Sequence, residues 1–316
     1  MIVEIDFSRI RTHLDLIEML SPAFNAQRGD EVHFEINLHT GPLLPDHLLL
    51  VASTVNNLRN SDINISGVFS QFNPKLDCIN YASRINFFRV IGFQYEESFT
   101  RHNPSGRFTE IKRFDNDNSI DVYNEVMRVL IANEINIDLL AVLHFCIWEV
   151  IDNTLNHSGE GFTLGAGHGF ICAQFYPFKK EVRIMIADNG IGIHKALTTH
   201  PNSEYSSLTE REAVEQCIEK GVTNSTGKGF GLWATASMIQ KNNGELIIHS
   251  GKHKLVGPNL SAARKTSNWA GTYTFLKINT EVPVYEKEIF GEHSSQRDQL
   301  EELIEDLNSS TIMDLW

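Results

Sequence analysis

Hydrophobic and polar positions follow two periods along the first 115 residues. Residues 30–38 (DEVHFEINL) place Val32, Phe34, Ile36 and Leu38 on one face, which predicts a half-buried strand. Residues 45–60 begin with proline and carry an apolar stripe at helical spacing, which predicts a helix. The same criteria predict elements at 62–69 (strand) and 75–93 (helix). Strands that alternate with helices predict an α/β domain over residues 1–115, with a polar connector at 100–119 that has room for one short strand.

A second set of elements begins near Ile120 and predicts a domain over residues 116–280. Two helices are followed by a glycine-rich loop and two strands, and an unpatterned segment precedes a last helix and two more strands. The expected ranges are helices at 121–133, 137–157 and 229–242, strands at 169–176, 181–187, 245–250 and 271–279, and the unpatterned segment at 194–226.

The tail, residues 281–316, is acidic and predicts one more helix. It holds ten acidic and two basic residues, so most of the formal net charge of −13 lies here. An apolar stripe along 294–310 (Leu300, Leu303, Ile304 and Leu307) lies between acidic flanks. Such a helix either packs on its own domain or binds a partner or a second copy of the chain.

Composition excludes several classes of protein. The chain is 41% hydrophobic and 21% charged, which is typical of a globular protein. It has no apolar run of about 18 residues and no signal-peptide pattern, so we expect a cytoplasmic protein without a membrane segment. The acidic balance argues against nucleic acid as a partner. The four cysteines are scattered and are expected to be free thiols.

Three polar residues interrupt the apolar helix expected at 137–157. Glu149, Asn153 and His157 recur every four residues and therefore form one stripe on a helix. This stripe is either a solvated face or a group directed at a ligand. Because most of the helix is apolar, a carboxylate and an amide buried there would need partners, and a metal–phosphate complex would supply them.

Two glycine-containing segments follow. Residues 181–193 (EVRIMIADNGIGI) predict a strand that leads into Asp188, with glycines at alternate positions after it. An ionised aspartate can accept a hydrogen bond from an exocyclic amino group, although a strand followed by an Asn-Gly turn would look the same. Residues 223–233 (TNSTGKGFGLW) place alternate glycines before a helix, whose free N–H groups suit phosphates. Neither the P-loop pattern nor the Rossmann pattern fits this segment.

In this order, the segments EVIDNTLNH, DNGIGI and GKGFGL, followed by AGTYTFLKI, resemble the GHKL ATPases, which include gyrase, the heat-shock chaperone, histidine kinases and MutL. The resemblance covers residues 121–280 and implies a Bergerat-fold α/β sandwich in which helices cover a mixed sheet. It implies ATP and Mg²⁺ as cofactors, with Glu149 as the catalytic residue, Asn153 on the metal, and residues 194–226 as a lid. It implies nucleotide contacts from Asn153, Asn156, His157, Asp188, Gly190, Gly192, Lys228, Gly229, Gly231, Leu232 and Thr272.

The first domain resembles the STAS (anti-sigma-factor antagonist) domains, through its strand–helix alternation and the segment YASRINFFRVIGF. The whole chain is then of the α/β (α+β) class. STAS regulators carry a phosphorylatable serine at a strand–helix junction. Ser66 and Ser70 lie near that place, but the usual acidic-serine pattern is missing.

Three functions fit these expectations. The first is a regulator that binds Mg-ATP and hydrolyses it slowly as a conformational switch. The second is a serine/threonine kinase of the anti-sigma type, in which Glu149 activates a partner's hydroxyl. The third is a non-catalytic module that uses ATP as a structural ligand. In each case we expect an unidentified protein partner, with a homodimer among the options.

Overall fold

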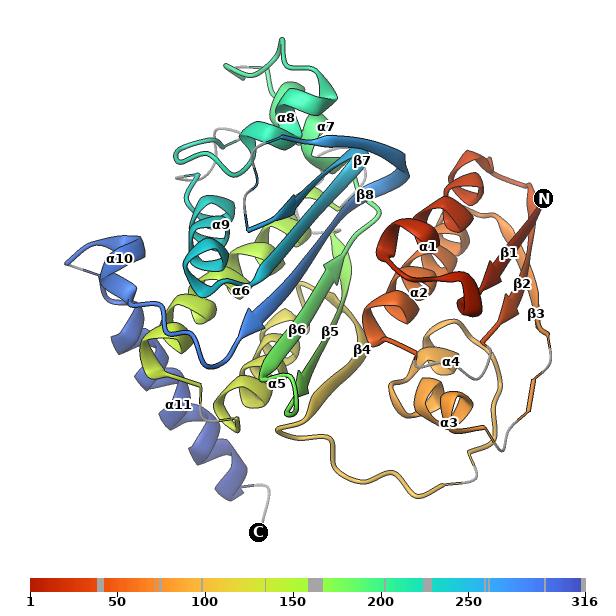
Figure 1. Ribbon diagram of the computed structural model, residues 1–316. Helices are drawn as coiled ribbons and strands as arrows, with labels where there is room; N and C mark the ends of the chain where they lie inside the picture. Colours follow the sequence, from red (N-terminus) through yellow and green to blue (C-terminus); the bar gives the residue numbers. More distant parts are fainter. Residues whose placement is uncertain are drawn as a thin grey trace.

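The computed structural model contains two sheets with helices between and beside them (Figure 1). It describes residues 1–38, 43–70, 72–73, 76–97, 99–133, 135–158, 167–201, 203–223, 229–258, 260, 262–292 and 294–313. In this described part, no helix is both long enough and apolar enough to cross a membrane.

The N-terminal part, residues 1–97, is built on a small parallel sheet in the order β1-β2-β3. Its strands are β1 (Ile2–Asp6), β2 (Glu31–Asn37) and β3 (Asn64–Phe69), and its longer helices are α1 (His13–Leu20) and α2 (Pro45–Asn60). Proline at the first position of α2 fits its role as a helix start. Strand and helix alternate, as the pattern predicted, because each crossover between parallel strands needs a helix.

The predicted helix over 75–93 is divided into α3 (Asp77–Arg84) and α4 (Phe87–Val90). Asn86 between them adopts a left-handed conformation with φ of 73°. The carbonyl of Ile85 accepts a hydrogen bond from the N–H of Ile111 at 2.9 Å instead of continuing a helix. A contact with a distant strand therefore ends α3, and the local pattern could not reveal it.

The larger sheet has five strands in the order β4-β5-β6-β8-β7. They are β4 (Phe108–Asp115), β5 (His168–Tyr176), β6 (Glu181–Ala187), β7 (Glu245–Gly257) and β8 (Arg264–Asn279). All four pairings are antiparallel, so the sheet is antiparallel throughout and not mixed. The reason is that hairpins or pairs of helices return the chain to the same end of the sheet before the neighbouring strand begins. β4 lies in the segment 100–119, which was expected to be a connector with room for one short strand.

One face of this sheet is covered by helices that follow β4 in the chain (Figure 1). They are α5 (Ser119–Ile131), α6 (Ile137–His157) and α9 (Gly231–Asn242), and α10 (Glu286–Phe290) and α11 (Gln296–Met313) pack outside them. Leu300 and Leu307 of α11 are buried in the same core as α6. Of the two options for the tail helix, packing on its own domain is the one observed. This α/β arrangement agrees with the fold that the resemblance implied.

The opposite face of the sheet is covered by α1 and α2 of the N-terminal part (Figure 1). Apolar residues of both parts form one continuous core there. From the sheet it contains Phe170, Cys172, Met185, Ala187, Ile247, Trp269, Tyr273 and Phe275. The N-terminal part is therefore packed directly on the sheet and not only joined to it by a linker.

Candidate functional site

The polar stripe of α6 lies at the edge of the core. Asn136 caps this helix by accepting hydrogen bonds from the N–H groups of Asp138 and Leu139. Glu149, Asn153 and His157 are each half-buried, so they are neither a fully solvated face nor part of the core. Within the described residues, the Asn153 side chain makes no recorded hydrogen bond, which leaves its amide oxygen available to a ligand.

Glu149 lies against the first turn of α9. A side chain at Gly231, the first residue of α9, would collide with the Glu149 carboxylate, so only glycine fits there. Burial, and then the negative charge of Asp152, raise the pKa of Glu149. The first-turn N–H groups of a helix have no intrahelical partners. The structure therefore places a carboxylate of raised basicity beside the N-terminus of α9, and helix N-termini are suited to binding anions.

Asp188 follows β6 and is 6% exposed. Its Oδ1 accepts hydrogen bonds from the N–H groups of Gly190, at 2.8 Å, and Thr272, at 3.3 Å. Among the described residues, no hydrogen bond is recorded for Oδ2, so one oxygen can receive an amino group. Burial outweighs the two backbone hydrogen bonds and raises the pKa of Asp188 to about 7.

Close backbone contacts hold the loop after Asp188. A side chain at Gly190 would collide with the C-terminal end of α6, whose His157 carbonyl accepts from the N–H of Ile191 at 3.1 Å. Gly192 has φ of 73°, and its Cβ would lie 2.8 Å from the Ser250 hydroxyl. α6 therefore carries Glu149 and also contacts the loop after Asp188, through His157, which is eight residues after Glu149.

Three residues that were not predicted from the sequence contact or form part of this loop: Ser250, Gly271 and Asn189. Ser250 of β7 accepts from the N–H of Ile193 at 2.9 Å and donates to the carbonyl of Gly271 at 2.9 Å. Gly271 has φ of 93°, and its Cβ would lie 2.6 Å from Asp188 Oδ1. Asn189 donates to the carbonyl of Ala270 at 3.1 Å. Gly271 precedes Thr272 in the quoted AGTYTFLKI, and this was the only signal for it in the sequence.

The remaining predicted residues are placed as follows. Asn156 is exposed and donates to Asp152 at 2.9 Å, whereas burial lowers the pKa of its neighbour His157. Leu232 packs against the core from the first turn of α9. Gly229 has φ of 65°, and its carbonyl accepts from the N–H of Gly221 at 2.9 Å.

The expected lid, residues 194–226, is only partly described. It contains the end of α7 (Gly192–Thr198) and all of α8 (Glu210–Gln216), which begins with a capping box at Thr209. The sequence pattern had indicated no helix there, because helices this short hold too few turns to show a period. Residues 224–226 of this segment and Lys228 lie outside the described residues.

The comparison with protein families agrees with this geometry. Residues 140–276 match a family model described as histidine kinase-, DNA gyrase B-, and HSP90-like ATPase. The match supports a GHKL-type ATP-binding site in this segment. A comparison with curated proteins finds no match. The matched segment contains the stripe, the Asp188 loop and the start of α9.

Proposed function

We propose that this protein is a regulator that binds Mg-ATP in the GHKL-type site and hydrolyses it slowly, with the nucleotide state passed to the N-terminal part. Asp188 and Thr272 would hold the adenine, and the first turn of α9 would hold phosphates. Asn153 offers an uncommitted amide oxygen, a donor that fits Mg²⁺ shared with phosphate oxygens and water. The metal would neutralise phosphate charge.

One observation carries the proposal of hydrolysis. Glu149 is held against Gly231 where a terminal phosphate would lie, and its pKa is raised. A carboxylate of higher basicity is a better general base for a water molecule. A site that only binds ATP would not need this carboxylate, because a negative charge beside phosphates weakens binding.

A hydrogen bond supports coupling to the N-terminal part. The buried hydroxyl of Ser53, on α2, donates to Oδ1 of Asn189 at 2.6 Å. Asn189 follows Asp188 in the chain. A movement of Asp188 on nucleotide binding would therefore change the Ser53–Asn189 hydrogen bond to α2. We assign a STAS-like regulatory role to the N-terminal part and a protein as the partner that responds to it. Ser66, which lies near the place of the phosphorylatable serine of STAS regulators, is exposed on β3, and its hydroxyl lies 2.8 Å from His33 Nδ1.

The test is incubation with γ-labelled ATP and Mg²⁺, alone and with cell extract. We expect free phosphate from the wild-type protein, and a rate about 10²–10⁴-fold lower in Glu149→Gln, because a general base contributes that much. ATP affinity should be equal or higher in this variant, because a negative charge beside the phosphates is removed. Asp121→Asn is the matched control, since Asp121 is an exposed carboxylate on the neighbouring helix α5 and does not act on Glu149.

The other outcomes are equally specific. Label on a serine or threonine of another protein would replace the proposal by the kinase function. Tight ATP binding without either product would leave a non-catalytic module. Equal hydrolysis by Glu149→Gln and the wild-type protein would remove Glu149 from the chemistry.

A further inference from the structure

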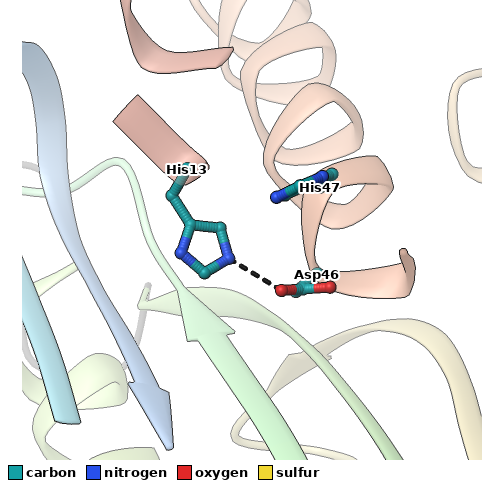
Figure 2. A group of neighbouring side chains, drawn as sticks. All are labelled: His13, Asp46 and His47. Atoms are coloured by element: carbon teal, nitrogen blue, oxygen red, sulfur yellow. Dashed lines mark hydrogen bonds and ion pairs between the residues drawn. The ribbon is translucent and has the colours of Figure 1, made fainter. Parts of the chain in front are cut away.

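A buried cluster of three potential metal ligands lies on the other side of the sheet from α6. His13 begins α1, and Asp46 and His47 lie in the first turn of α2. One ligand atom from each residue lies within 4.8 Å of the others, and all three residues are buried. Figure 2 shows the His13 ring and the Asp46 carboxylate directed at each other, with the His47 ring beside them. Nε2 of His13 donates to Oδ2 of Asp46 at 2.7 Å.

Two donor groups of this cluster are not used inside the protein. Oδ1 of Asp46 is fully buried without a hydrogen-bond partner in the described part of the chain. Over the same residues, no hydrogen bond is recorded for the ring of His47, which contacts the His13 ring edge-on at 5.0 Å. A buried carboxylate oxygen without a partner costs on the order of 1–3 kcal/mol, so a native protein usually supplies a partner.

We propose that His13, Asp46 and His47 bind one divalent transition-metal ion of the zinc class. Two imidazoles and one carboxylate are a common ligand set for Zn²⁺, with water in the fourth position, whereas Mg²⁺ and Ca²⁺ prefer oxygen alone. In a tetrahedral site, ligand atoms lie about 3.3 Å apart. Oδ2 of Asp46 and Nε2 of His13 would separate slightly, and His13 would bind through Nε2 as its neutral Nδ1–H tautomer, with the Nε2 proton passing to Nδ1 or, from the imidazolium, to solvent.

The charges that face the cluster do not prevent this. Arg183 of β6 acts on Asp46 and His47 from a distance, but its guanidinium is paired with Glu181 at 2.7 Å. Asp15 of α1 adds a negative charge that also acts on His47. The ionised Asp46 is the nearest charge to the ion, and its attraction is strengthened by burial.

The ion would tie two helices together where they contact the sheet. The His13 ring packs edge-on against Phe275 of β8, with ring centroids 4.7 Å apart. α1 and α2 are joined by residues 21–44, so a shared ion would fix their N-terminal ends relative to each other. The site would therefore stabilise the attachment of the N-terminal part to the sheet.

The test uses the full chain stripped by a chelator and titrated with Zn²⁺ at pH 7.5 without nucleotide. We expect one zinc ion per chain after dialysis, and a rise in the unfolding temperature. Asp46→Asn and His47→Gln should each weaken binding by more than the ~100-fold that follows loss of an outer-shell partner. His249→Gln is the matched control. His249 is buried and its ring contacts Tyr273, as the His13 ring does, but His249 lies outside the cluster.

X-ray absorption at the zinc edge gives a second measurement on the wild-type protein, which does not depend on the folding of a variant. It should detect nitrogen and oxygen ligands, including imidazole, and no sulfur. The proposal is overturned if the stripped protein binds no zinc, if sulfur is a ligand, or if folded Asp46→Asn and His47→Gln bind zinc as tightly as His249→Gln does.

Discussion

Asp46 and Asp188 are two buried carboxylates with opposite electrostatic behaviour. Asp46 is 3% exposed and has a pKa of about 2, whereas Asp188 is 6% exposed and has a pKa of about 7. Burial raises the pKa in both cases. The difference is the partner: His13 contributes a hydrogen bond and a charge to Asp46, while Asp188 receives only two backbone N–H groups. Within the described residues, the charge of Asp46 therefore has a partner at one of its two oxygens, whereas Asp188 has no partner of opposite charge.

The largest expected effect is at Asp188. Without nucleotide and above pH 7, Asp188→Asn should raise the free energy of unfolding by about 4 kcal/mol, because it removes a buried charge. The same variant should bind ATP on the order of 10–100-fold more weakly, since a hydrogen bond to a charged acceptor is lost. Chemical denaturation and calorimetric titration measure the two effects.

The pH dependence of this gain has a definite sign. The pKa of Asp188 is raised from 3.8 to about 7 by folding, so its contribution to stability is present below pH 3.8 and lost as the pH rises through about 7. The gain in Asp188→Asn should therefore be near zero at pH 4 and grow up to pH 7. A gain that does not vary with pH would show that Asp188 is paired in the folded protein.

The second effect has the opposite sign. In chelator-treated protein at pH 7, Asp46→Asn should lower the free energy of unfolding by about 2 kcal/mol, because a charge-assisted hydrogen bond becomes a neutral one. Asp62→Asn is the control, since Asp62 makes an exposed ion pair with Arg28 and should change stability little. If Asp46→Asn were as stable as this control, the pairing described for Asp46 would be wrong.

The smallest effect concerns the contact between the two parts. Ser53→Ala removes the hydrogen bond to Asn189 and should cost about 1 kcal/mol of stability. ATP affinity should change about two- to fivefold, because Asn189 adjoins Asp188, the proposed adenine-binding residue. Ser61→Ala is the control at the residue that caps the C-terminus of α2, because among the described residues its hydroxyl donates only to the carbonyl of Asn57. Equal nucleotide affinities in the two variants would argue against coupling through α2.

The sequence predicted features that depend on local periodicity and on short motifs. Residue spacing alone predicted the bounds of α6, the glycine-containing turn after Asp188 and the helix that begins near Gly231. Contacts between distant segments could not be predicted in this way. Neither the approach of His13 to Asp46 nor the Ser53–Asn189 hydrogen bond, which spans 136 residues, leaves a local pattern. The break of the helix at Asn86 has the same origin.

The continuous core between the sheet and the helices α1 and α2 has a consequence for unfolding. Trp269, Tyr273 and Phe275 are buried by residues that precede them by more than 200 positions. Separating the N-terminal part would expose this apolar face of the sheet to water. The two parts should therefore unfold together in one cooperative transition, and neither part should behave as an independent folding unit.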